Sequence, residues 1–187
     1  MANPMEIKGD NIWEKLGSLH WFPIGAIILL LIFIPLLNPL GLPISTNTWT
    51  EDAYDAVLAV PDDKVVIWED NWAISGLADS EPGHIALMRI MLENNVKFVM
   101  VSLTPDTPLL HTYVTDAVSK YPESQGKVYG VDWVQMGFLA GQEGALSLMA
   151  EDMHSAFSTD YYGTPLSQLP LMNNVIDFND VALVISG

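Results

Sequence analysis

The chain has 187 residues, no cysteine, and a formal net charge of −16 at pH 7. The missing cysteines exclude disulfides and thiolate metal sites. Most of the negative charge lies after residue 45, where the sequence has 20 Asp or Glu residues and only five Lys or Arg residues. A negative field repels nucleic acid. We therefore expect no nucleic-acid partner.

Residues 24–44, IGAIILLLIFIPLLNPLGLPI, contain no charged side chain. A run of about 20 apolar residues is long enough to span the hydrocarbon core of a bilayer as a helix. The run therefore predicts a transmembrane anchor over residues 20–44, with the lipid bilayer as a partner of residues 24–44. Because proline ends or kinks a helix, Pro35 and the prolines after it limit the regular helix to about residues 20–38.

The charges on either side of the apolar run predict its orientation. Lys8 and Lys15 precede the run, and the next basic residue after it is Lys64. The positive-inside rule then places residues 1–19 in the cytoplasm and the main domain outside it, in a single-pass membrane protein. No small-x-small cleavage site follows the run, which favours an uncleaved signal anchor over a signal peptide.

Residues 45–49 read as a linker, and residues 50–187 suit one compact domain. Strand and helix patterns alternate along it, which predicts an α/β domain with a mainly parallel sheet and helices on both faces. Because the last strand has no covering helix after it, we expect the natural chain to continue beyond Gly187. The expected strands are 64–70, 97–103, 127–134 and 181–186, and the expected helices are about 50–59, 80–94, 104–121 and 143–157.

Ligands of open parallel sheets bind at the carboxyl ends of the strands. This rule selects Asp70 and Asn71 after the first strand, Thr104 after the second, and Asp132 and Trp133 after the third, as a candidate ligand-binding site. Carboxylates meeting there could bind a divalent cation or a polar ligand, or could simply cap helices. The same rule also places Glu69, Ser102, Asp106 and Ser186 at this edge, with Trp68 and Trp72 nearby.

Several catalytic and cofactor signatures are missing from the sequence. The turn GFLAGQEG (137–144) has no Lys and matches neither the dinucleotide nor the P-loop spacing, so no nucleotide cofactor is expected. There is no G-x-S-x-G elbow. Two Glu-x-x-His pairs, Glu81/His84 and Glu151/His154, fall at opposite ends of their helices, so we expect them to be surface residues and not a shared metal site.

Three stretches, KFVMVSLTPDTP, VYGVDWVQMGFLAGQEGAL and DYYGTPLSQLPLM, resemble a group of uncharacterised, membrane-anchored, Rossmann-like α/β proteins of the outer face. The likeness covers about residues 50–187. It implies an N-terminal membrane helix followed by an outward α/β domain, and it implies no activity, cofactor or site residue.

The leading hypothesis is a non-catalytic, membrane-anchored α/β domain that binds a partner protein in the membrane or a small ligand, as a subunit of a membrane complex. One alternative is a metal-assisted hydrolase using Asp70 and Asp132, which requires these carboxylates to lie within about 5 Å of each other. Another is an extracytoplasmic solute-binding module, which requires a second lobe.

Overall fold

The computed structural model describes residues 21–37 and 45–187. The chain divides into two units, Met1–Thr46 and Asn47–Gly187. In the first unit, helix α2 (Trp21–Leu37) has no buried residue. Within the two described ranges, no helix is both long enough and apolar enough to cross a membrane. The predicted cytoplasmic segment 1–19 and the end of the predicted anchor, 38–44, lie outside the described residues.

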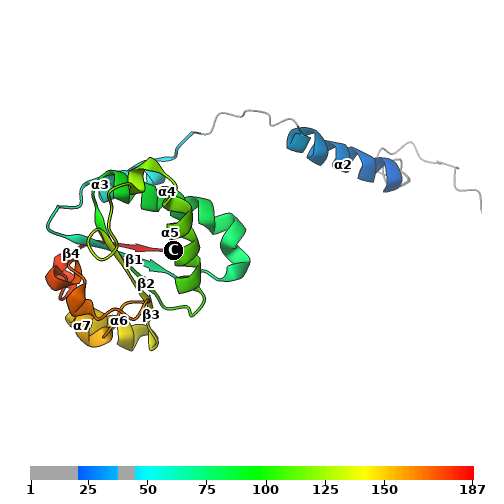
Figure 1. Ribbon diagram of the computed structural model, residues 1–187. Coiled ribbons are helices and arrows are strands. Elements are labelled where there is room, and N and C mark those ends of the chain that lie inside the picture. The colour runs from blue at the N-terminus through cyan, green and yellow to red at the C-terminus, as the bar shows by residue number, and fades with distance from the viewer. Residues whose placement is uncertain (1–20, 38–44) are drawn as a thin grey trace, which may run out of the picture. The chain divides into compact units, whose positions relative to one another are not determined.

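The second unit is built on a four-stranded sheet with the strand order β3-β2-β1-β4 (Figure 1). All three pairings between neighbouring strands are parallel, which confirms the predicted α/β class with a parallel sheet. The central strands are buried on both faces, as expected for continuous apolar runs. The strands are β1 (Val65–Asp70), β2 (Lys97–Ser102), β3 (Trp133–Phe138) and β4 (Val181–Ser186).

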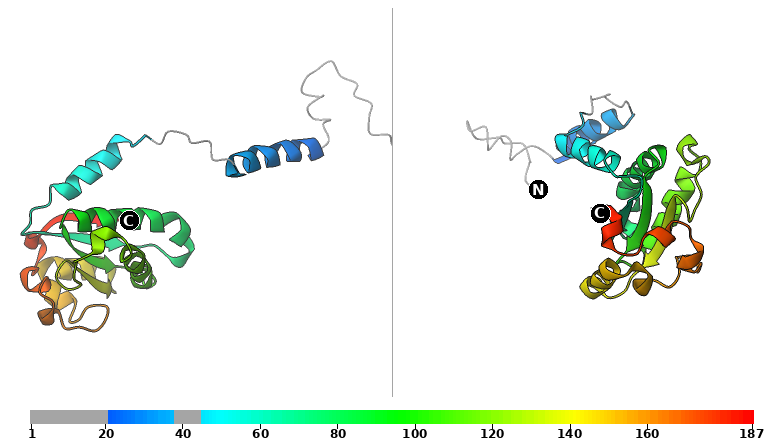
Figure 2. Two further views of the ribbon diagram at one scale, coloured as in Figure 1. Left: turned by 45° about the horizontal axis from the view of Figure 1, so that its top comes forward. Right: turned by 90° about the vertical axis from the view of Figure 1, so that its left-hand side faces the viewer.

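Helices cover both faces of this sheet, as the alternating pattern predicted (Figures 1 and 2). Helices α4 (Leu77–Glu93) and α5 (Thr107–Val118) pack on one face, against Val66, Trp68 and Phe98. Helices α6 (Gln142–Glu151) and α7 (Met153–Ala156) pack on the other face, against Ile67 and Val99. Successive residues of each strand point to opposite faces, so each strand contributes side chains to the hydrophobic core on both faces of the sheet.

The remaining elements are short. Helix α3 (Thr48–Leu58) begins after Asn47, whose side chain caps it by accepting a hydrogen bond from the Thr50 amide at 2.8 Å. The short helical turn η1 (Ile74–Gly76) precedes α4, and a second one, η2 (Pro122–Ser124), follows α5. The long connection before β4 contains η3 (Leu166–Gln168), η4 (Met172–Asn174) and η5 (Phe178–Asp180). It supplies buried residues to the core on the α6/α7 face, namely Leu166, Leu169, Leu171, Met172 and Val175.

The third strand starts later than the sequence predicted. The expected strand covered residues 127–134, whereas β3 begins at Trp133. The residues before it form a turn that the Asp132 side chain closes, because its Oδ2 atom accepts a hydrogen bond from the Val128 amide at 2.7 Å. Gly130 adopts a φ of +83°, a left-handed conformation that glycine tolerates best. Asp132 therefore precedes the strand instead of ending it.

The predicted single helix over 143–157 is in fact two helices. The break lies at Asp152, whose backbone is extended with φ −156°. The Asp152 side chain accepts hydrogen bonds from the amides of His154 and Ser155 and so caps α7. Buried Met149 and Met153 still face the sheet on either side of the break, which is why the apolar spacing looked continuous.

Candidate functional site

The order of the strands directs attention to the end of β1. Strands β2 and β3 are added on one side of β1, and the chain then returns to the other side to form β4. In open α/β sheets, ligands bind at the carboxyl ends of the strands where the direction of winding changes in this way. Asp70 ends β1 and Ser186 ends β4, so these two residues border that position.

One set of polar side chains joins the carboxyl ends of β4, β1 and β2. Ser186 Oγ donates a hydrogen bond to Glu69 Oε2 at 2.6 Å, and Asn71 Nδ2 donates to Glu69 Oε1. Asn71 Oδ1 in turn accepts from the Leu103 amide at 3.1 Å and from Thr104 Oγ1 at 3.2 Å. The structure thus brings the predicted residues Asn71 and Thr104 together. Because these groups satisfy one another, the network holds the strand ends in register.

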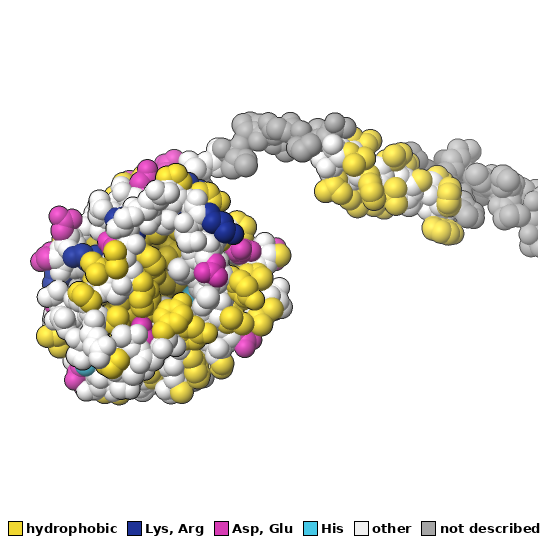
Figure 3. Space-filling view, viewed as in Figure 1, with side chains coloured by type: hydrophobic (Ala, Val, Ile, Leu, Met, Phe, Trp, Pro, Cys, Tyr) yellow, Lys and Arg dark blue, Asp and Glu magenta, His cyan; other side chains and the backbone are white. Residues whose placement is uncertain are grey.

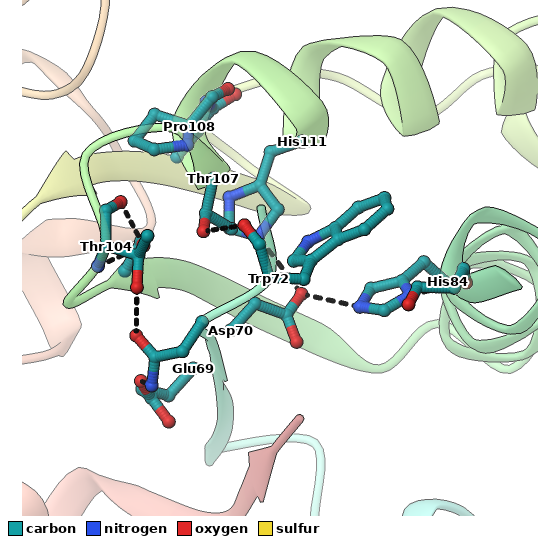
Figure 4. A network of polar contacts seen from close by, with 12 residues as sticks. Glu69, Asp70, Trp72, His84, Thr104, Thr107, Pro108 and His111 are labelled. Carbon is teal, nitrogen blue, oxygen red and sulfur yellow. Dashed lines mark hydrogen bonds and ion pairs between the residues drawn. The ribbon is translucent and has the colours of Figure 1, made fainter. Parts of the chain in front are cut away.

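A second set surrounds Asp70, whose side chain is 1% exposed. Its Oδ2 atom lies 3.0 Å from His84 Nε2 and 3.1 Å from His111 Nε2. Figure 4 shows the two rings approaching the carboxylate from different sides, His84 from α4 and His111 from α5. We name these three residues, together with Trp68 and Trp72, the Asp70 cluster.

The two tryptophans of the cluster lie against the His84 ring. The Trp72 and His84 centroids are 4.4 Å apart with 16° between the ring planes, and the Trp68 and His84 centroids are 5.5 Å apart with 21° between them. Trp68 also lies 5.9 Å from the His111 ring in a tilted arrangement. Faces of tryptophan rings attract cations, so this surrounding favours a protonated imidazole.

The hydrogen bonds of His84 indicate the same protonation state. His84 Nδ1 lies 2.7 Å from the carbonyl oxygen of Ser80, which can only accept a hydrogen bond. His84 Nε2 faces the Asp70 carboxylate, which also accepts, so both ring nitrogens are placed to donate. Burial acts to lower the pKa of His84, but the bonds to Asp70 and to the Ser80 carbonyl outweigh it and raise the pKa above 6.5.

Asp70 is the charged partner of this imidazolium. Burial by itself would raise the pKa of the Asp70 carboxyl, but hydrogen bonds from His111 and His84 outweigh it and hold the pKa below 3.8. Linkage then sets the pH range of the pair. The His84 contribution to stability is complete below pH 6.5 and is lost as the pH rises through its raised pKa. The Asp70 contribution is present above pH 3.8 and is lost as the pH falls through its lowered pKa.

Two buried nitrogens of the cluster lack a partner. In the part of the chain that the structure describes, neither Trp72 Nε1 nor His111 Nδ1 makes a hydrogen bond. His111 is fully buried and Trp72 is 8% exposed. Buried polar atoms in proteins are nearly always hydrogen-bonded, so each of these two nitrogens keeps a hydrogen-bonding capacity that no described residue satisfies.

The arrangement does not resemble a metal site or a nucleophilic triad. Both Nε2 atoms lie in direct hydrogen-bond contact with the same oxygen, Asp70 Oδ2, and residues 21–37 and 45–187 contain no group of three His, Asp or Glu side chains suited to a metal ion. A nucleophile needs a base in hydrogen-bond contact. Neither nearby hydroxyl is bonded to a histidine of the cluster, because Thr107 Oγ1 donates to the Trp72 carbonyl and Ser186 Oγ donates to the Glu69 carboxylate.

The other two predicted site residues lie at the opposite edge of the sheet. Asp132 precedes β3 and Trp133 begins it, whereas Asp70 ends β1. Trp133 stacks on Phe98 near the start of β2, with centroids 6.4 Å apart. The expectation that Asp132 and Trp133 follow a strand is therefore wrong, because the turn at 128–132 delays β3. The structure does not meet the geometric requirement of the hydrolase alternative.

Sequence reasoning missed both histidines of the cluster. His84 was expected on a helix surface, but its side chain is 15% exposed and contacts Asp70. One signal was present: Trp68 and Asp70 alternate at the end of β1, where alternate residues share a face, and Trp72 continues the alternation just after the strand. A carboxylate between two buried tryptophans needs a donor, and the next two helices along the chain each carry one histidine.

The resemblance to membrane-anchored outer-face proteins stays a prediction. Comparison of the chain with protein-family models, with curated proteins and with solved structures found no match.

Proposed function

We propose that this protein is a non-catalytic, membrane-anchored domain that binds a small molecule at the Asp70 cluster. The observation that carries the proposal is the pair of buried, unpartnered nitrogens, Trp72 Nε1 and His111 Nδ1, at the position where the sheet changes its winding direction. Apolar walls with a few convergent polar groups are typical of small-molecule sites. A non-catalytic role is supported by the hydroxyls of Thr107 and Ser186, which bond to the Trp72 carbonyl and to Glu69 and not to either histidine.

The ligand site is tested with three small probes of similar size: the cation N-methylguanidinium, its neutral analogue N-methylurea, and the anion methylphosphonate. Each is titrated into the full chain in detergent micelles while the indole N–H resonances are followed by NMR. We expect at least one probe to shift the Trp72 resonance saturably and to leave Trp133, at the other edge of the sheet, unchanged.

A His111→Phe variant keeps an aromatic ring in place and removes both ring nitrogens, the unpartnered Nδ1 and the Nε2 atom that contacts Asp70. We expect it to weaken binding of the same probe about tenfold, which is the loss typical of one buried hydrogen bond. If no probe shifts Trp72, or if Trp133 shifts equally, the cluster is not a ligand site.

The anchor is supported by the uncharged run at 24–44 and by the visible face of α2, where Figure 3 shows many hydrophobic side chains and no charged ones. Its apolar side chains are exposed, Leu31 at 67% for example. The full chain should float with phosphatidylcholine vesicles and stay with them after an alkaline wash. Replacing Leu30 and Leu31 together by Lys should release it, because each buried lysine costs about 3 kcal/mol in a bilayer. Leu109→Lys, in the second unit, is the matched control and should still float.

A further inference from the structure

The Asp70 cluster already surrounds one organic cation, the protonated imidazole ring of His84. From this we infer that the ligand of the site is itself a flat organic cation, an imidazolium or guanidinium group, which takes the place of the His84 ring. The inference rests on the proposed function and adds the chemical class of the ligand and the way in which it enters. The partners of such a cation are the Asp70 carboxylate and the Ser80 carbonyl, and not the Trp72 indole N–H, which only donates.

The contacts of the His84 ring describe what such a ligand would meet. At one end is the buried carboxylate of Asp70, 3.0 Å from Nε2, and at the other is the Ser80 carbonyl, 2.7 Å from Nδ1. Trp72 lies nearly parallel to the ring at 4.4 Å, and Trp68 lies nearly parallel to it at 5.5 Å. Two acceptors in the plane and aromatic faces against it match a flat cation that carries N–H groups.

His84 is also the member of the cluster that solvent reaches. Its side chain is 15% exposed, while those of Asp70 and His111 are 1% and 0% exposed. It lies in the middle of α4, the helix that spans Leu77–Glu93, so the side chain can turn without a change in the ends of the helix. Turning the His84 side chain outward would open the site and leave the bond between Asp70 and His111 in place.

The charge around the cluster selects against anions. An anionic ligand in the place of the His84 ring would meet the Asp70 carboxylate, whose Oδ2 atom lies 3.0 Å from His84 Nε2. Figure 3 shows Asp and Glu side chains spread over the visible face of the domain. Like charges at such distances repel, whereas a cation replacing the His84 imidazolium leaves the local charge unchanged.

The first test removes the His84 ring by mutation and offers free imidazole in its place. His84→Ala removes the ring, and we expect the melting temperature of the full chain in micelles at pH 6 to fall. Added imidazole, which is protonated at that pH, should restore it. Pyrazole has the same size and shape but stays neutral, and it should bind about tenfold more weakly because it lacks the charge.

His154→Ala is the matched control, since His154 is also half-buried and bonds through Nε2 to the Met172 carbonyl at 2.9 Å, away from the cluster. Its melting temperature should not respond selectively to imidazole. Equal rescue of His84→Ala by imidazole and pyrazole would show that the site recognises the shape of the ring and not its charge. That result would overturn the inference. An absence of rescue in folded His84→Ala would overturn it as well.

The wild-type chain provides a second measurement, in case His84→Ala does not fold. N-methylguanidinium should shift the Trp72 indole resonance and the His84 ring resonances together, at a concentration about tenfold below that of N-methylurea. If N-methylurea or methylphosphonate binds and N-methylguanidinium does not, the proposed ligand site stands and the cation class is wrong. If no probe binds, both proposals fail.

Discussion

Replacing Asp70 with Asn should lower the free energy of unfolding by about 3 kcal/mol, the usual effect of removing one partner of a buried ion pair. The Asp70 side chain is 1% exposed and is the acceptor that His84 and His111 share. Without its charge, the His84 imidazolium remains next to Trp72 with no counter-ion. Urea unfolding of the full chain in micelles at pH 6, followed by tryptophan fluorescence, measures the loss.

Asp79→Asn is the matched control, because Asp79 is exposed in the first turn of α4 and should change stability by less than about 0.5 kcal/mol. A second readout is the titration of His84 by NMR. In the wild type its midpoint should lie above 6.5, and in Asp70→Asn it should move to lower pH, because the carboxylate that raises the pKa is gone. An unchanged midpoint would show that Asp70 does not stabilise the imidazolium.

The second large effect is expected at Trp68, in the middle of β1. Trp68→Ala should lower the free energy of unfolding by about 4 kcal/mol, the typical cost of removing a large aromatic side chain from a core. Trp68 is 1% exposed, and its ring lies 6.1 Å from that of Phe98 as well as against both histidines of the cluster. Urea unfolding, followed by circular dichroism, measures this loss.

Trp49→Ala is the control for this experiment. Trp49 is 80% exposed on α3, so its removal should change the unfolding free energy by less than about 0.5 kcal/mol. If Trp68→Ala unfolds at nearly the same urea concentration as Trp49→Ala, then β1 is not the packing centre of the α4/α5 face. The two substitutions separate the effect of burial from the effect of losing a tryptophan.

The connection after β1 differs from that of a dinucleotide-binding site, although the strand order is similar. The order 3-2-1-4 matches part of the Rossmann arrangement, in which a glycine-rich turn after β1 leads directly into a helix that binds pyrophosphate. Here the buried carboxylate of Asp70 ends β1, and α4 starts after the additional turn η1 with Asp79 in its first turn. Negative groups thus stand where a phosphate would bind, and the same position suits a cation.

The sequence alone determined the class of the fold and one edge of the site. Continuous apolar runs at β1 and β2 predicted strands buried on both faces, and the structure confirms them. The strand-end rule correctly placed Asp70, Asn71 and Thr104 at the carboxyl edge, because the apolar runs that define where β1 and β2 end can be read from short segments. The start of β3 was predicted wrongly. The Asp132 side chain accepts a hydrogen bond from the Val128 amide and Gly130 is left-handed, so the residues before Trp133 form a turn instead of a strand.

Only the tertiary structure decided what surrounds Asp70. His84 and His111 come from two helices, 14 and 41 positions further along the chain, and nothing in their local patterns aims them at β1. Which side chain reaches the carboxylate depends on how α4 and α5 rotate as they pack on the sheet. That rotation is set by many core contacts at once, including those of Met88, Met91 and Leu110, and not by any one segment of the chain.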